Sequence, residues 1–121
     1  MPTEATMKAA LQAYLDHFNA GDADGLTALF AADANVEDPV GSPPHIGTEA
    51  IRAFYVDAMK NGAKLSLSAP MRGSHANAAA MAFEAKIGTL TVRIIDVMTF
   101  NEAGKVTSMK AYFGPEDFIQ G

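Results

Sequence analysis

The chain contains no cysteine, no run of basic residues and no long apolar stretch. Without cysteine it has neither a disulfide framework nor thiolate chemistry. Its 14 acidic residues outnumber the 9 basic ones, and the net charge of −5 argues against binding to nucleic acid or to anionic membranes. No apolar run approaches the roughly 20 residues of a membrane span. The N-terminus lacks the charged-then-apolar pattern of a signal peptide, so we expect a cytoplasmic protein.

The composition is that of a folded domain. Hydrophobic residues make up 49% of the chain and charged residues 19%, which excludes a disordered protein. A length of 121 residues is close to the common domain size. With no internal repeat, linker or low-complexity tract, we predict a single domain spanning residues 1–121.

The first half of the chain has the periodicity of helices. Residues 5–20 and about 49–60 carry apolar stripes at helical spacing, and Thr48 is the expected cap of the later helix. A short helix is expected after Asp22, with Phe30 on its apolar side. Between the helices, residues 35–38 predict a short strand and the Pro- and Gly-rich residues 39–47 predict a loop.

The second half alternates as strands do. The alternating stretches cover residues 65–68, about 81–87, 92–100 and about 105–113. Gly88-Thr89 and residues 101–104 are the expected turns. Short turns imply an antiparallel, strongly curved sheet, which the three helices can cover on one face. We therefore predict an α+β fold shaped like a half-open cone.

The most apolar of these strands has an aspartate at its centre. Alternate residues of a strand share a face, so Asp96 lies with Val92, Ile94, Met98 and Phe100, and Arg93 falls on the other face. A carboxylate that faces a core costs several kcal/mol unless it is paired or protonated. Asp96 therefore either satisfies a buried polar group or supplies a neutral carboxylic acid that donates a hydrogen bond.

Three other polar side chains are candidates for the same interior. Tyr14 and Tyr55 lie on the apolar stripes of their helices, where Tyr55 is a candidate partner for the Tyr14 hydroxyl. Taken alone, each tyrosine is more simply interpreted as a core aromatic. Asp38 precedes Pro39 at the mouth of the loop and, taken alone, is more simply interpreted as a turn former. Together, an ionised carboxylate, a neutral carboxylic acid and a phenol suit proton abstraction next to a carbonyl, with the neutral donors holding the enolate oxygen.

Segments along most of the chain resemble the bacterial ketosteroid isomerases, a family of the nuclear-transport-factor-2-like (NTF2-like) superfamily. The most specific are the Val-Glu-Asp-Pro-Val-Gly sequence around Asp38 and the buried Asp96. The fold alone is less specific, because that superfamily hosts many activities. The matching segments are Tyr14, residues 19–22, 36–42, Gly47, residues 53–55, 71–75, 95–98 and 109–113.

The resemblance implies a steroid Δ-isomerase that moves the double bond of 5-ene-3-ketosteroids to the conjugated 4-ene position through a dienolate, without metal or organic cofactor. Asp38 would be the general base that carries a proton from C4 to C6. Tyr14 and protonated Asp96 would form the oxyanion hole at the C3 oxygen, and Tyr55 would orient Tyr14. The implied steroid pocket comprises Phe18, Val40, Phe54, Met59, Met81, Phe83, Ile94, Met98 and Phe113. For each of these, plain core filling is an equally good interpretation.

The resemblance also implies a homodimer that forms through the sheet. The hairpin between Phe83 and Asp96 is several residues shorter than in the best-known members, which alters the rim of that sheet. Phe30 and Phe113 stand where some members have Tyr and Trp. Two alternatives remain open: another enzyme on this fold, of the dehydratase, epoxide hydrolase or polyketide cyclase type, and a non-catalytic module that binds apolar ligands. Those enzymes typically need more His or Asp/Arg in the cavity. His17, His45 and His75 lack ligand spacing, so we expect them at surface or loop positions.

Overall fold

The computed structural model describes residues 1–121 and confirms the predicted α+β class. Side-chain caps start the first two helices: Thr3 accepts from the Thr6 N–H, and Asp22 accepts from the Gly25 N–H. No helix is both long and apolar enough to cross a membrane. The helices are α1 (Glu4–Asn19), α2 (Ala23–Thr27) and α3 (Thr48–Ala58), which the 3₁₀ turn η1 (Met59–Asn61) continues; a second 3₁₀ turn is η2 (Pro115–Asp117).

Seven strands form one sheet, in the order β2-β1-β6-β5-β4-β3, with the C-terminal β7 paired to β5. All neighbours are antiparallel except β1 and β6, which are parallel. Gly88, with a φ of +60°, allows the tight turn between the two longest strands, as predicted. The strands are β1 (Phe30–Glu37), β2 (His45–Ile46), β3 (Lys64–Leu67), β4 (Ala78–Ile87), β5 (Leu90–Phe100), β6 (Val106–Tyr112) and β7 (Phe118–Gln120).

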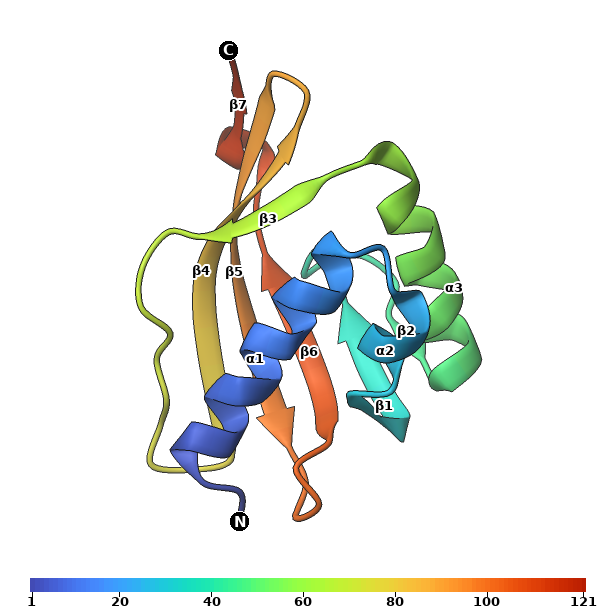
Figure 1. Ribbon diagram of the computed structural model, residues 1–121, viewed down its shortest axis with the longest axis vertical. Helices are drawn as coiled ribbons and strands as arrows, with labels where there is room; N and C mark the ends of the chain where they lie inside the picture. The colour runs from blue at the N-terminus through green and yellow to red at the C-terminus, as the bar shows by residue number, and fades with distance from the viewer.

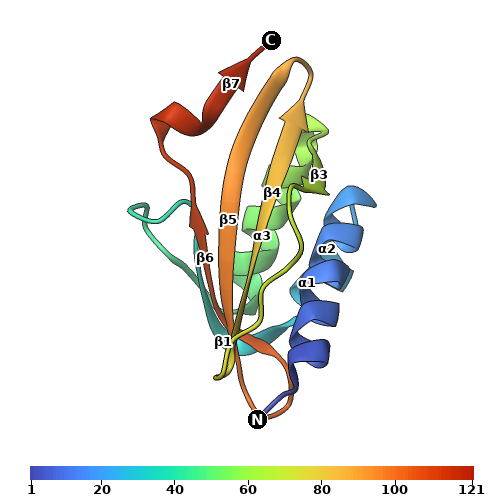
Figure 2. The ribbon, with the colours of Figure 1, turned by 90° about the vertical axis from the view of Figure 1, so that its left-hand side faces the viewer.

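The three helices gather on one side of the curved sheet, and the other side is left uncovered. Figure 1 shows α1 crossing in front of β4, β5 and β6, with α2 and α3 beside it. In Figure 2, turned by 90°, α1 stands to one side of the curved β4–β5 hairpin and the C-terminal segment to the other. Buried apolar side chains fill the space between helices and sheet.

Several boundaries differ from the sequence prediction. Phe30 begins β1 rather than belonging to the second helix, because it pairs with Val106 of β6, a long-range contact that local periodicity does not report. Thr48 is the first residue of α3, and Gly47 occupies the N-cap without a side-chain hydrogen bond. Within the predicted loop, His45 and Ile46 pair with β1 as β2. The segment formed by η2 and β7 was not predicted at all.

Candidate active site

A cavity of about 330 Å³ lies between the helices and the concave face of the sheet. Its wall brings together residues that are far apart in the sequence: Tyr14 from α1, Tyr55 from α3, Asp96 from β5 and Asp38 from the loop after β1. Among the 17 residues of the wall, only Asp38, Asn61 and Asp96 are not hydrophobic. The four polar residues predicted from the sequence therefore converge on one apolar chamber.

Asp96 is buried in this chamber without a hydrogen-bond partner. Its exposed fraction is 1%, and both carboxyl oxygens lack a partner within the chain. Burial, and then the charge of Asp38, raise the pKa of Asp96 well above its ordinary value. The strand alternation predicted this placement, with Arg93 exposed on the other face. A carboxyl group in these surroundings keeps its proton, and that proton is free for a ligand.

The two tyrosines form a hydrogen-bonded pair. Their hydroxyl oxygens are 2.9 Å apart, and their rings meet edge to face with centroids 5.7 Å apart. The pKa of each phenol is raised well above 10, mainly by burial, so both are neutral. Each hydroxyl has one proton, so when one tyrosine donates to the other, the acceptor keeps its own proton for a third group. This pair confirms the predicted partnership of Tyr14 and Tyr55.

Asp38 is held at the edge of the cavity by a fixed loop. The Val40 N–H donates to the Ala111 carbonyl of β6 at 2.8 Å, and the Gly41 N–H donates to the Glu37 carboxylate at 2.8 Å. Asp38 is half-buried, and burial raises its pKa to about 6. It is therefore mostly ionised at pH 7, whereas Asp96 is neutral. The cavity thus holds one carboxylate and one carboxylic acid.

Five of the nine predicted pocket residues line the cavity: Phe18, Phe54, Phe83, Ile94 and Phe113. The other four lie elsewhere. Met81 and Met98 are on the predicted face, but they are buried in the core and do not reach the cavity wall. Met59 packs against the core without reaching the wall, and Val40 lines a depression on the opposite face of the sheet.

Eight wall residues were missed. Four of them, Leu65, Ala85, Ile87 and Val92, lie on apolar strand faces, so the alternation could have found them. Phe118 gives no such signal, because it reaches the cavity only through the pairing of β7 with β5; its ring lies 5.9 Å from that of Phe113. The remaining three are Ala58, Asn61 and Ala63.

None of the three histidines lines the cavity. His17 contacts Asp22 at 3.2 Å near the end of α1, and His75 is exposed in a loop. His45, in β2, stacks on Phe54 with ring centroids 4.4 Å apart. No group of three or more histidine or acidic side chains is arranged to hold a metal ion.

Comparisons with known proteins agree on the fold and diverge on activity. The model of the SnoaL-like domain matches residues 11–109. The steroid Delta-isomerase of Nocardioides simplex is 39% identical over 119 residues, which cover 95% of each chain. The epoxide hydrolase LasB of Streptomyces lasalocidi is 25% identical over 125 residues, and the match spans 44% of its length.

A solved structure of the epoxide hydrolase/cyclase-like enzyme SalBIII superimposes with a TM-score of 0.92 over 100% of both chains. At 24% identity, that likeness shows a shared fold. The extent of the SnoaL-like match and the 39% identity to a steroid isomerase establish the family. The chain belongs to the SnoaL-like, NTF2-like proteins and is of the ketosteroid-isomerase type within them.

Proposed function

We propose that the protein is a steroid Δ-isomerase that converts 5-ene-3-ketosteroids to their conjugated 4-ene isomers. The observation that carries the proposal is the buried carboxyl of Asp96, which has no partner in the chain and faces a cavity shared with the half-buried Asp38. A core without ligand chemistry has no use for such a group, because an unsatisfied buried polar group costs about 1–3 kcal/mol. The similarity to a steroid isomerase supplies the substrate class.

The proposed reaction moves one proton. The ionised carboxylate of Asp38 takes a proton from C4, and the C–H electron pair moves through the enol system to the C3 oxygen. Asp38 then returns the same proton to C6, which forms a new C–H bond and restores the carbonyl. Substrate and product have the same atoms and charge, so no co-reactant is needed. A base whose pKa is about 6 is suited to taking and giving a proton near neutral pH.

The dienolate oxygen would be held by Tyr14 and by neutral Asp96. Donors fixed in an apolar cavity stabilise developing charge more than the same donors do in water, because little solvent competes. Tyr55 would orient Tyr14 through the 2.9 Å hydroxyl contact. A phenol and a carboxylic acid are suited to this task because both are neutral before the reaction and donate more strongly as the negative charge grows.

The direct test follows the ultraviolet absorbance of the conjugated enone after mixing with 5-androstene-3,17-dione. We expect absorbance to grow far faster than in buffer. With deuterium at C4 and ordinary water as solvent, part of the label should appear at C6, since Asp38 carries the same proton between the two carbons. Growth of the enone absorbance no faster than in buffer would rule out the proposed function.

A second candidate is opening of an epoxide, favoured by the similarity to LasB. Asp96 could supply the acid that protonates the epoxide oxygen, and Asp38 could supply the carboxylate that activates the attacking oxygen. The aromatic and aliphatic wall favours a large apolar substrate in either case. Turnover of an apolar epoxide in place of the ketosteroid would select this candidate.

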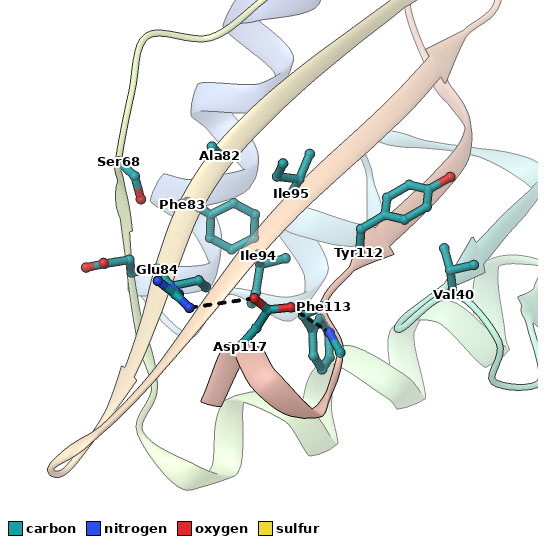
Figure 3. Close-up of a pocket in the computed structure, with 12 residues that line it drawn as sticks. Val40, Ser68, Ala82, Phe83, Glu84, Ile94, Ile95, Tyr112, Phe113 and Asp117 are labelled. Atoms are coloured by element: carbon teal, nitrogen blue, oxygen red, sulfur yellow. Dashed lines mark hydrogen bonds and ion pairs between the residues drawn. The ribbon is translucent and has the colours of Figure 1, made fainter. Parts of the chain in front are cut away.

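We further propose a homodimer formed through the uncovered face of the sheet. A shallow depression of about 720 Å³ lies there, and Figure 3 shows Ile95, Tyr112 and Val40 side by side along it. These three side chains are 48%, 47% and 40% exposed. The depression exceeds the cavity in volume but contains no buried acid, so it suits contact between protomers better than catalysis. Sedimentation of the protein, with Tyr112→Glu as the interface variant, distinguishes dimer from monomer.

A further inference from the structure

The cavity has a deep end and an open end, and the exposure of its wall tells them apart. Tyr14, Tyr55 and Asp96 are 3%, 1% and 1% exposed. Phe118, on the same wall, is 47% exposed, and Asn61 is exposed as well. The groups proposed to hold the reacting carbonyl therefore lie at the deep end. The opposite end of a bound ligand lies beside Phe118 and Asn61.

Strand register shows that the cavity is elongated. Asp96 pairs with Met81, whereas Val92 pairs with Ala85 on one side and with Phe118 on the other. The four residues from Asp96 to Val92 span roughly 13 Å along β5 at about 3.3 Å per residue. The wall continues past this level to Ile87. A ligand that contacts Asp96 can thus extend along the hairpin toward the open end.

Asn61 is the one amide on the cavity wall, and its orientation is fixed. Its Oδ1 accepts a hydrogen bond of 3.0 Å from the backbone N–H of Ala63, which is 7% exposed and also lines the cavity. Because an N–H must meet the oxygen of the amide, the NH₂ group occupies the other position. The Nδ2 donors have no partner within the chain, so they are available to a ligand at the open end.

The local turn does not itself require an amide. Asn61 ends η1, and Gly62, with a φ of +75°, turns the chain into β3. The bond from Ala63 uses only the side-chain oxygen, so aspartate would serve the turn equally well. The NH₂ group is what remains unexplained by the fold, and it is the only amide donor on a wall that is otherwise apolar apart from the two aspartates and the tyrosine hydroxyls.

We propose that Asn61 is a specificity-determining residue that donates a hydrogen bond to the end of the substrate remote from the reacting carbonyl. The preferred ligand is a ketosteroid that carries an oxygen acceptor, such as a ketone, on its far ring. The inference rests on the proposed steroid isomerase function. It predicts that the preference for a steroid with a far oxygen depends on this one hydrogen bond, while the chemistry at Asp38 is unchanged.

Binding of conjugated products, which undergo no further turnover, isolates this contact. Dissociation constants are measured by NMR titration for 4-androstene-3,17-dione and for 4-androsten-3-one, which lacks the far oxygen. We expect the wild-type protein to prefer the dione, and Asn61→Leu to lower that preference about fivefold, the equivalent of about 1 kcal/mol for one hydrogen bond. Changes in folding or cavity shape affect both ligands and cancel in the ratio.

Two further variants separate the role of the Asn61 amide as a donor from the role of its oxygen in the turn. Asn61→Asp keeps an oxygen for the Ala63 N–H but removes the amide donors, so it should disfavour the far ketone and favour testosterone, whose far hydroxyl can donate to the carboxylate. Lys60→Ala, on the neighbouring exposed residue, should keep the wild-type ratio.

An unchanged ratio in Asn61→Leu, or a continued preference of Asn61→Asp for the ketone, would overturn the inference while leaving the isomerase proposal intact. Absence of both steroid binding and steroid turnover would overturn both.

Discussion

Strand β5 presents an ionisable side chain on each of its two faces, and the surroundings of these two side chains are opposite. On the outer face, the side chains of Arg93 and Asp117 are 56% and 40% exposed, and the Arg93 Nη2 lies 3.9 Å from the Asp117 Oδ1. On the inner face, Asp96 is 1% exposed and unpaired. An exposed ion pair contributes about 0–1 kcal/mol to stability. A buried acid without a partner instead stays protonated, which turns a charge into a hydrogen-bond donor.

The inner face contains a second contrast, between two acids in one cavity. Asp38 sits on a loop at the edge, where partial burial brings its pKa to about 6, and Asp96 sits deeper, where burial raises its pKa further. Each acid therefore has a different protonation state at neutral pH. Perturbed acids of this kind in an apolar cavity are what acid–base catalysis requires.

The largest expected effect follows from removing the proposed base. Asp38→Asn keeps the shape of the side chain but cannot take the C4 proton, so kcat should fall by about 10²–10⁴-fold. Binding of 4-androstene-3,17-dione should survive, because the wall and the donors remain. Turnover close to that of the wild type would assign the base to another residue.

Removing either donor should have the next largest effect. Asp96→Leu and Tyr14→Phe each eliminate one proposed hydrogen bond to the dienolate, and each should lower kcat by about 10²–10³-fold with a smaller change in KM. Comparing the loss of kcat in these variants with that in Asp38→Asn then separates the effect of the donors from the effect of the base. Equal activity of Asp96→Leu and wild type would show that Asp96 is only a buried structural acid.

The pH dependence of activity should follow Asp38. Only the ionised carboxylate abstracts a proton, so kcat/KM should be constant above about pH 7 and fall tenfold per pH unit below about 6. The steady-state profile of the free enzyme measures this directly. A midpoint near 4 would mean that burial does not perturb Asp38.

The stability of the fold should respond to Asp96 with the opposite trend. The unfolded chain releases this proton near pH 3.8, but the folded chain keeps it, so the free energy of unfolding declines as pH rises above about 4 toward the raised pKa. Asp96→Asn removes this dependence. Relative to wild type, its unfolding free energy should rise by up to about 1.4 kcal/mol per pH unit in urea denaturation. A pH-independent difference would contradict the raised pKa.

The smallest effect is expected on the outer face. Arg93→Gln breaks the exposed contact with Asp117, and it should change the free energy of unfolding by less than about 1 kcal/mol. Its effect should diminish further in high salt, whereas that of Asp96→Asn should not. A large loss of unfolding free energy in Arg93→Gln that does not depend on salt would show that the two faces of β5 differ less in their electrostatics than proposed.

Much of the site could be predicted because it depends on local patterns. The alternation of residues 92–100 placed Asp96 inward and Arg93 outward, and the helical stripes placed Tyr14 and Tyr55 in one core, where their hydroxyls do meet. The tight turn at Gly88 was equally visible. These features need only the period of a strand or helix and the residue types of turns.

The features that escaped prediction depend on contacts between distant segments. Phe30 joins β1 because β6 pairs with it, and Phe118 reaches the cavity because β7 pairs with β5. Met81 and Met98 share the face of Asp96, yet they pack in the core instead of lining the cavity. Which part of an apolar face stays open is decided by the helices above it, and the sequence of the strand does not record this.

The most direct test of the account is an NMR pH titration of the side-chain carboxyl carbons of Asp38 and Asp96. We expect Asp38 to titrate with a midpoint of about 6 and Asp96 to keep its proton through that range. Asp38→Asn and Asp96→Asn assign the two signals, since each variant removes one of them. Ionisation of Asp96 with a midpoint near 3.8 would contradict the claim that it is a neutral donor.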